Sequence, residues 1–160
     1  MIFINMLSTA GMTKGHGVLS AFEEQTRLVR EGLGDQYTIL INSWKKADIL
    51  HFHTVNPSFL LRSWFTSAVK VGYVHFLPQT LEGSIRLRKL IQKLLCKYVL
   101  LFYQSMDKLI VVNPSFIPKL VECGIPEEKV TYIPNFVDDE QFHPIGEERR
   151  QLVRQKYGLD

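Results

Sequence analysis

The sequence predicts an α/β protein: a Rossmann-like parallel sheet with helices packed on both of its faces. Short apolar runs alternate with longer amphipathic segments along all 160 residues, which is typical of strands joined by helical crossovers. The strand-like runs are almost continuously apolar, as expected of strands that are buried on both faces. Crossovers of this kind are right-handed, so the strands should lie parallel in one sheet.

Length and composition are those of one globular domain with a formal net charge of +3. No run reaches the roughly 18 apolar residues of a membrane span, and the apolar start has no positively charged segment or cleavage site of a signal peptide. Cys96 and Cys123 have neither metal-ligand spacing nor the density of a disulfide scaffold. We therefore expect reduced thiols in a cytosolic protein. No nucleic-acid-binding motif is recognised, so we expect no nucleic acid partner.

The first expected strand, residues 2–6, leads into a loop of small residues and then into a helix over residues 18–31. Strand, glycine loop and helix form the opening of a nucleotide-binding βαβ unit. Glycines let the backbone approach a phosphate, and the helix start supplies unpaired N–H groups. The spacing G-x(3)-G-x-G is degenerate, so a plain surface loop is an equally good interpretation.

Two strands are expected over residues 37–41 and 48–52, joined by a short polar connector. The second one ends in H-F-H-T, and we expect His51 and His53 to point to opposite faces. One of them would face a cleft, and the other would pack in the core. We expect no metal site, because no third ligand follows at a suitable spacing.

A helix is expected from Pro57 to about residue 68, since proline suits the first helical turn. We place its aromatic residues Phe59, Trp64 and Phe65 in the core. The apolar strand over residues 69–74 then delivers His75 at its carboxyl end, where open α/β sheets bind ligands. A polar loop follows, with Gln79, Thr80, Glu82 and Ser84.

The next helix is expected over residues 85–105, and four basic residues lie on one narrow stripe of its surface: Arg86, Lys89, Lys93 and Lys97. Apolar residues fill most of the remaining surface. The stripe is either the solvated side of a buried helix or a surface that meets anionic lipid headgroups. Further strands are expected over residues 107–112 and 130–133, with helices over 115–122 and 147–157.

Several motifs together resemble those of retaining glycosyltransferases of family 4, which have the GT-B fold. That family carries I-P-N-G-V-D followed by a phenylalanine, and this chain has Y-I-P-N-F-V-D-D-E-Q-F over 132–142, with Phe136 in place of the glycine. The glycine loop, H-F-H-T and V-N-P-S over 112–115 resemble further family segments. The family's E-x(7)-E pair lies in the carboxyl-terminal half and has no counterpart here.

The resemblance implies the amino-terminal half of a GT-B fold. Residues 1–145 would form the acceptor-binding domain, and residues 146–160 would lead into a missing domain that binds the nucleotide-sugar. His75 would lie near the transferred sugar as the catalytic residue, and the donor diphosphate would be approached by Gly15, His16 and Gly17. The acceptor would be contacted by His53, Thr54, Gln79 and Glu82.

Within the family, the segment Y-V-H-F-L-P-Q-T-L-E-G-S with its lysine-rich apolar helix most resembles bacterial enzymes that glycosylate diacylglycerol or glycosyl-diacylglycerol. This implies hexose transfer with retention from UDP-glucose or UDP-galactose to a membrane glycolipid, with no cofactor. Arg86, Lys89, Lys93 and Lys97 would contact an anionic membrane, on the inner face of the cell membrane, and the chain alone would be inactive. The alternatives are a soluble or polysaccharide-precursor acceptor, or a non-catalytic partner subunit.

Overall fold

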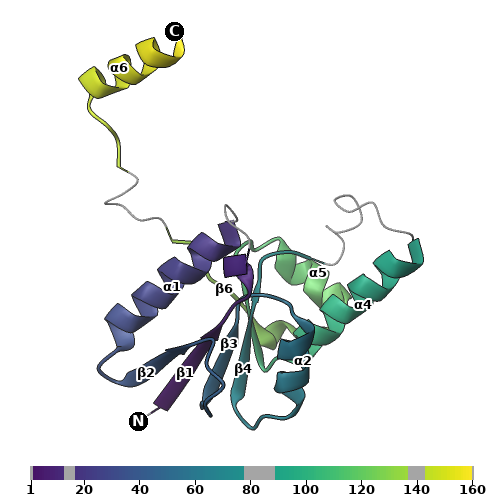
Figure 1. The fold of residues 1–160 in the computed structure, drawn as a ribbon. Helices are drawn as coiled ribbons and strands as arrows, with labels where there is room; N and C mark the ends of the chain where they lie inside the picture. Colours follow the sequence, from purple (N-terminus) through teal and green to yellow (C-terminus); the bar gives the residue numbers. More distant parts are fainter. Residues whose placement is uncertain (1, 13–16, 78–88, 137–142, 160) are drawn as a thin grey trace.

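The structure is a computed structural model that describes residues 2–12, 17–77, 89–136 and 143–159. Its described residues form a six-stranded, fully parallel sheet in the order β2-β1-β3-β4-β5-β6 (Figure 1). The strands are β1 (Ile2–Leu7), β2 (Tyr37–Ile41), β3 (Ile49–Phe52), β4 (Val69–Val74), β5 (Lys108–Val111) and β6 (Val130–Tyr132). All six lie where the apolar runs predicted strands.

The helices also follow the predicted order. They are α1 (Gly17–Leu33), α2 (Pro57–Trp64), α4 (Lys89–Gln104), α5 (Phe116–Glu122) and α6 (Glu147–Tyr157), with 3₁₀ turns η1 (Ala10–Met12) and η3 (Glu127–Lys129). The first four residues expected in the helix over 85–105 lie outside the described residues. Helix α2 ends at Trp64 rather than near residue 68.

Local sequence signals explain where several helices begin and end. The Asn56 side chain accepts a hydrogen bond from the Ser58 N–H, with Pro57 in the first turn of α2, as a helix start requires. Gly124 after α5 and Gly158 after α6 have φ of 82° and 61°. Glycine adopts this left-handed conformation without steric cost, so it ends a helix readily.

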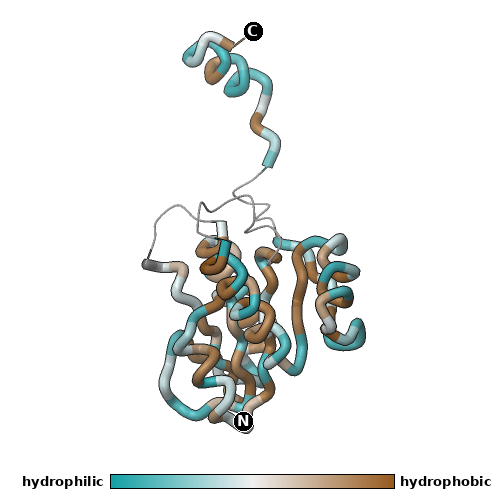
Figure 2. The backbone as a smooth tube through the Cα atoms, turned by 90° about the vertical axis from the view of Figure 1, so that its right-hand side faces the viewer, coloured by the Kyte–Doolittle hydropathy of each residue, from teal (hydrophilic) through white to brown (hydrophobic). Residues whose placement is uncertain are grey.

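Alternating strand residues build a core on each face of the sheet. On one face, Ile4 and Met6 of β1 pack against Phe22 of α1. On the other, the larger core joins β1, β3, β4 and β5 to α2, α4 and α5, and Phe102 of α4 meets Phe52 edge to face. Helices therefore cover both faces, as predicted, and Figure 2 shows hydrophobic residues concentrated along the strands between them.

Helix α6 lies apart from these layers (Figure 1). None of its residues is buried, and Figure 2 shows that it is largely hydrophilic. The assignment of residues 146–160 to a link with a further domain stays a prediction.

At the amino edge of the sheet, where the strands begin, two aspartates form hydrogen bonds with the backbone of neighbouring strands. The Asp48 carboxylate accepts the Phe3 N–H at 2.8 Å, while the Phe3 carbonyl accepts the Asp48 N–H at 2.9 Å. Asp107 and Lys70 repeat the same exchange at 2.8 and 2.9 Å. Each aspartate immediately precedes a strand, so it pairs backbone groups that the adjacent strand would otherwise leave to solvent.

Candidate active site

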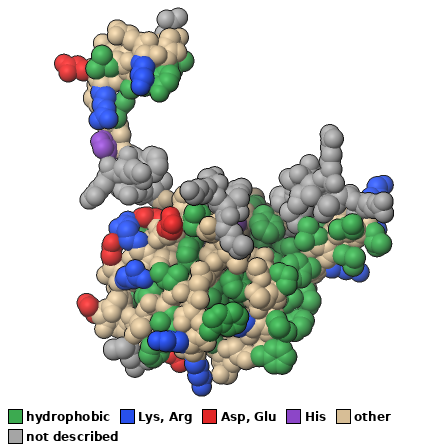
Figure 3. Space-filling model, in the orientation of Figure 1, with side chains coloured by type: hydrophobic (Ala, Val, Ile, Leu, Met, Phe, Trp, Pro, Cys, Tyr) green, Lys and Arg blue, Asp and Glu red, His purple; other side chains and the backbone are tan. Residues whose placement is uncertain are grey.

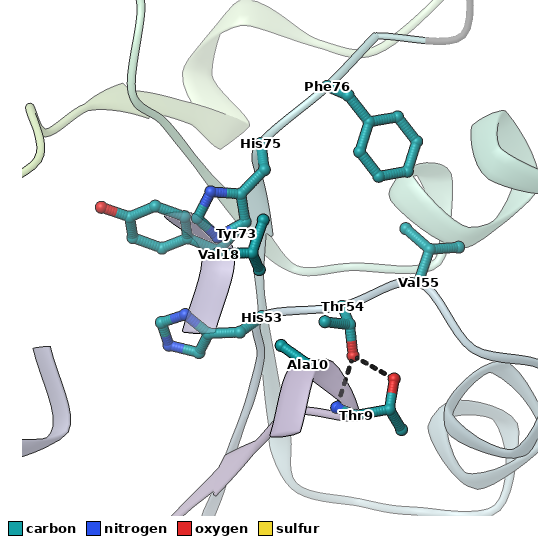
Figure 4. Close-up of a pocket in the computed structure, with 9 residues that line it drawn as sticks. All are labelled: Thr9, Ala10, Val18, His53, Thr54, Val55, Tyr73, His75 and Phe76. Atoms are coloured by element: carbon teal, nitrogen blue, oxygen red, sulfur yellow. Dashed lines mark hydrogen bonds between the residues drawn. The ribbon is translucent and has the colours of Figure 1, made fainter. Parts of the chain in front are cut away.

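A pocket of about 290 Å³ opens at the carboxyl ends of β1, β3 and β4. Figure 4 shows the side chains that line it, which come from the residues just before and at the start of η1, the start of α1, the segment after β3, and the end of β4 with the segment after it. They are Thr9, Ala10, Val18, His53, Thr54, Val55, Tyr73, His75 and Phe76. This is the edge at which open parallel sheets bind ligands, and the lining combines apolar walls with a few hydroxyl and imidazole groups, as small-molecule sites do.

Three histidines and a tyrosine form a continuous aromatic ladder beneath this pocket. The His53 ring stacks on Tyr73 with centroids 5.0 Å apart and an interplanar angle of 13°. Tyr73 lies 4.7 Å from His75, and His51 lies 4.6 Å from His53. The expectation that His51 and His53 point to opposite faces is therefore wrong. Residues two apart on a strand share a face, so both rings lie on the α1 side, where Phe22 meets His53 edge-on.

Burial keeps the three imidazoles neutral at pH 7. It lowers the pKa of His75 to about 4. Burial, with a smaller contribution from His75, lowers the pKa of His51 to about 4. Burial, followed by the charges of His51 and His75, lowers the pKa of His53 to about 2. A neutral imidazole offers one N–H donor and one acceptor nitrogen.

Several of these ring nitrogens have no hydrogen-bond partner among the residues that the structure describes. They are both nitrogens of His53, together with Nε2 of His51 and Nε2 of His75. An unpaired polar atom inside a protein costs free energy unless water or a ligand satisfies it. His53 and His75 also line the pocket, so their rings are the histidine rings nearest to a ligand bound there.

The loop after β1 is held against the pocket by three short hydrogen bonds. The Thr54 hydroxyl accepts the Thr9 N–H at 2.9 Å and lies 3.0 Å from the Thr9 hydroxyl (Figure 4). The Asn42 side-chain oxygen accepts the Ser8 N–H at 2.9 Å. Asn42 has φ of 47°, a left-handed conformation that asparagine tolerates better than most residues. Thr54, expected to bind an acceptor, also shapes the pocket wall.

Helix α4 anchors the segment that carries His75. The buried Tyr103 hydroxyl donates to the Phe76 carbonyl at 2.9 Å, and burial raises the pKa of Tyr103 well above its usual range. The hydroxyl therefore remains a donor, and it fixes the backbone immediately after His75.

The remaining expected site residues divide into described and undescribed ones. Gly17 begins α1 at the surface, and a Cβ placed on it would meet nothing within 4 Å. Its small size is thus not required by packing against described residues. The predictions for Gly15, His16, Gln79, Glu82 and Arg86 fall outside the described residues.

No cluster of three or more His, Cys, Asp or Glu side chains that could hold a metal ion occurs in the described part of the chain. The pocket lining includes no carboxylate among the residues that the structure describes. The polar side chains that the described residues offer at this pocket are imidazoles and hydroxyls.

The comparison with protein families decides what kind of protein carries this site. The model of Glycosyltransferase Family 4 matches residues 26–141. The chain belongs to Glycosyltransferase Family 4. The matched region runs from α1 past β6 and includes His53, Thr54, Tyr73 and His75, so the pocket lies largely within the family domain.

Two curated relatives of this family member are similar over much of the chain. The alpha-galactosylglucosyldiacylglycerol synthase of Streptococcus pneumoniae is 44% identical over 98% of this chain and 42% of the relative. The mannosylfructose-phosphate synthase of Agrobacterium fabrum is 27% identical over 70% of this chain and 23% of the relative. The chain thus spans less than half the length of the curated relatives it matches.

Solved structures support the fold. HepE of Anabaena, crystallised with UDP and glucose, superposes with a TM-score of 0.70 at 12% identity, over 99% of this chain and 50% of HepE. The same protein crystallised with UDP-glucose gives a TM-score of 0.69 over the same shares. The Rossmann-like half of a GT-B fold, predicted from the sequence, is confirmed.

The family domain presents a mixed surface along α4. Lys89, Lys93 and Lys97 are exposed, as the stripe predicted. Exposed apolar residues accompany them, namely Leu90, Ile91, Leu94 and Leu101. Within the described residues, no helix is both long and apolar enough to pass through a bilayer.

Sequence reasoning missed two residues that shape the pocket, Tyr73 and Asn42. Tyr73 lies two residues before His75 and, by the register of β3 with β4, beside His53. A correct reading of the two-residue strand period would have placed all four rings of the ladder on one face. Asn42 carries no signal of its own beyond the tendency of asparagine to end strands.

Proposed function

We propose that this chain is the acceptor-binding domain of a glycosyltransferase that transfers a hexose from a UDP-sugar to a glycosyl-diacylglycerol, with retention of configuration. The observation that carries the proposal is the 44% identity to a glycosyl-diacylglycerol synthase over 98% of the chain. The name of that relative favours galactose as the transferred sugar and glucosyl-diacylglycerol as the acceptor. The nucleotide-sugar would be bound mainly by a second domain beyond these residues.

The pocket geometry supports specific roles for its residues. His75 would contact the sugar near the reacting carbon, through its neutral ring or backbone carbonyl, and stabilise positive charge that develops there. His53 and Thr54, with Gln79 and Glu82, would bind acceptor hydroxyls. The unpaired nitrogens of His53 and His75, two residues that line the pocket, support this assignment, because sugar hydroxyls both donate and accept hydrogen bonds.

The start of α1 would receive the donor diphosphate. A helix start favours anions through its unpaired N–H groups and partial positive charge. The open space above Gly17 supports a close approach, with Gly15 and His16 as the other proposed contacts.

Helix α4 would hold the enzyme at the inner face of the cell membrane. Its exposed side offers lysines to anionic headgroups and leucines to the apolar boundary beneath them. Each lysine near an anionic surface contributes on the order of 1 kcal/mol. Because Tyr103 of α4 fixes the backbone beside His75, the same helix would bring the pocket to its lipid acceptor.

A transfer assay with the full protein tests the proposed activity. Radiolabelled UDP-galactose or UDP-glucose is incubated with vesicles that contain glucosyl-diacylglycerol or diacylglycerol, or with soluble glucosylglycerol. We expect label in the organic phase with a lipid acceptor, and an α-anomeric product by proton NMR. Label found only in water-soluble product would contradict the lipid acceptor, and an inverted anomer would contradict retention.

Vesicle co-sedimentation tests the membrane contact separately. Binding to anionic vesicles should weaken as salt rises and should fall sharply in the variant Lys89→Glu, Lys93→Glu, Lys97→Glu. The matched control reverses three exposed charges elsewhere: Arg30→Glu, Lys119→Glu and Arg149→Glu. Equal loss in both triple variants would show a general charge effect and would overturn the assignment to α4.

We expect the 160-residue chain by itself to fold but to transfer no sugar. Its two cores support folding, whereas the proposed donor domain lies elsewhere. Calorimetric titration with UDP should show at most weak binding. Micromolar affinity for UDP would mean that the donor site is largely contained in this chain.

A soluble acceptor is the second candidate. One observation favours it, since the Agrobacterium fabrum relative is named for a phosphosugar rather than a lipid product. The glucosylglycerol arm of the transfer assay separates the two candidates.

A further inference from the structure

The aromatic residues expected in the core at the end of α2 are instead at the surface. Trp64 is 55% exposed and Phe65 is 82% exposed, so the prediction that they are core residues is wrong. Helix α2 buries Leu60 and Ser63, and residues one position further along the helix point outward. Leu61, Trp64 and Phe65 stand three and four residues apart, so they share the outer side of α2.

Trp44, from the connector between β2 and β3, joins this outer side. It is 84% exposed, and the Arg62 guanidinium of α2 lies 5.5 Å from the centre of its ring. Arg62 also donates to the Ser43 and Lys45 carbonyls at 2.8 and 3.3 Å. The connector is thereby fixed beside α2. We call Trp44, Leu61, Trp64 and Phe65 the tryptophan surface.

The tryptophan surface lies next to α4 in the same helical layer. The Ser63 and Ser105 hydroxyls, at the ends of α2 and α4, are 3.3 Å apart. Both helices pack on the same core, and Figure 3 shows hydrophobic side chains gathered over α2 and α4. Two exposed tryptophans with neighbouring apolar residues form a patch of the kind that marks an interaction site.

The charged residues around the tryptophan surface indicate what kind of partner it would contact. Residues 42–47, α2 and α4 contain no aspartate or glutamate. They do contain six basic residues: Lys45, Lys46, Arg62, Lys89, Lys93 and Lys97. A second copy of the chain docked face to face would bring these cations against each other without compensating carboxylates. An anionic bilayer provides both the opposite charge and an apolar interior.

We propose that the tryptophan surface inserts into the headgroup region of an anionic membrane, as a second contact beside α4. Tryptophan prefers this region because its ring is largely apolar and its N–H can remain hydrated. The neighbouring lysines can extend to the phosphates while their stems stay in contact with apolar groups. The inference rests on the proposed membrane function and adds residues outside α4 to it.

Fluorescence tests this directly, because Trp44 and Trp64 are the two tryptophans of the chain. The 160-residue chain is mixed with phosphatidylglycerol vesicles that contain a brominated phosphatidylcholine, which quenches only tryptophans inserted among the lipids. We expect a blue shift and strong quenching, and both should persist in Trp44→Phe and in Trp64→Phe, each of which retains one reporter.

Serine variants measure the contribution to binding. Phe65→Ser removes an almost fully exposed side chain, so folding should survive, and we expect vesicle affinity to fall by about tenfold. Leu33→Ser, at the end of α1 on the other side of the sheet, is the matched control and should bind as the parent does.

The possible failures are distinct. Salt-sensitive vesicle binding without tryptophan quenching would overturn the tryptophan surface while leaving the α4 contact intact. A blue shift without lipid, together with a dimer in analytical ultracentrifugation, would show instead that a second copy covers this side. No binding to anionic vesicles at all would remove the membrane contact of α4 together with this one.

Discussion

The two edges of the sheet differ in whether certain polar groups at the strand ends are hydrogen-bonded. At the amino edge, Asp48 and Asp107 each exchange two short hydrogen bonds with the neighbouring strand. At the carboxyl edge, both ring nitrogens of His53 and Nε2 of His75 have no partner among the described residues. The same strands connect the two edges, so the difference arises from the residues placed at their ends.

This difference predicts which of these residues contribute to stability and which contribute to ligand binding. Paired groups at the amino edge stabilise the fold and leave little for a ligand to bind. Buried unpaired groups at the carboxyl edge cost stability, which suits a site that a ligand completes. We therefore expect replacement of the paired aspartates to alter unfolding and replacement of His75, whose Nε2 is unpaired, to alter catalysis.

The largest expected effect is that of His75→Ala on turnover by the full protein. Loss of a group that stabilises charge in the transition state lowers kcat by about 10²- to 10³-fold. We expect a much smaller change in KM for the acceptor and an unfolding midpoint close to that of the parent. Steady-state kinetics with a glucosyl-diacylglycerol acceptor checks this, and near-normal kcat would refute a role of the His75 ring.

Acid should destabilise the chain through the buried histidines. Their folded-state pKa values lie near 4 for His51 and His75 and near 2 for His53, below the usual value of about 6.5. Between pH 6.5 and 4 the unfolded chain therefore binds more protons. The free energy of unfolding should fall as pH drops through this window, by on the order of 1 kcal/mol per pH unit for each histidine.

Urea denaturation at intervals from pH 7.5 to 5 measures this slope. His51→Phe removes one of the three groups without changing the lining of the pocket, so its slope should be shallower. A slope that is unchanged in this variant would mean that other groups cause the acid sensitivity.

Asn42 at the carboxyl edge allows a smaller test of how the pocket loop is held. Asn42→Gly removes only the side-chain bond to the Ser8 N–H, because glycine accepts the positive φ. Asn42→Ala also forces alanine into that conformation, which costs roughly 1 kcal/mol more. Thermal unfolding should rank the parent above Gly and Gly above Ala; equal stability of the two variants would contradict the strain.

At the amino edge, Asp107→Ala should cost about 1 kcal/mol of unfolding free energy, since it removes the exposed bond from the Lys70 N–H and the ion pair with Lys70 Nζ at 3.6 Å. The full protein that carries this change should keep its kcat. Chemical denaturation and the transfer assay measure the two quantities. A large loss of activity with unchanged stability would show that Asp107 contributes to function rather than to stability, which is the opposite of our expectation.

Much of the fold was predictable because its signals are local. The apolar run from Val69 to Val74 became β4, and Asn56 with Pro57 marked the start of α2. Strand alternation with helices then led to the parallel sheet. The position of His75 after β4 followed from the same strand.

The predictions from the sequence were wrong where the same residue type can be either buried or exposed, or can face either side of the sheet. The aromatic residues Trp64 and Phe65 suggested burial, but α2 has apolar residues at successive positions, so its sequence alone does not show which side faces the core. Treating His51 and His53 as facing opposite sides ignored the two-residue period of a strand. The pairing of His53 with Tyr73 depends on the register between β3 and β4, which is a tertiary property. Assignments to Gln79 and Glu82 stay predictions.

The central claim is that unpaired histidine nitrogens at the carboxyl edge bind acceptor hydroxyls, and histidine NMR tests it most directly. The ¹⁵N-labelled chain is titrated with glucosylglycerol, the headgroup of the proposed acceptor without acyl chains. The ring nitrogens of His53 and His75 should shift, while the Phe3 and Lys70 amides at the amino edge stay in place. Unchanged histidine signals at concentrations that saturate transfer by the full protein, or shifts confined to the amino edge, would contradict the account.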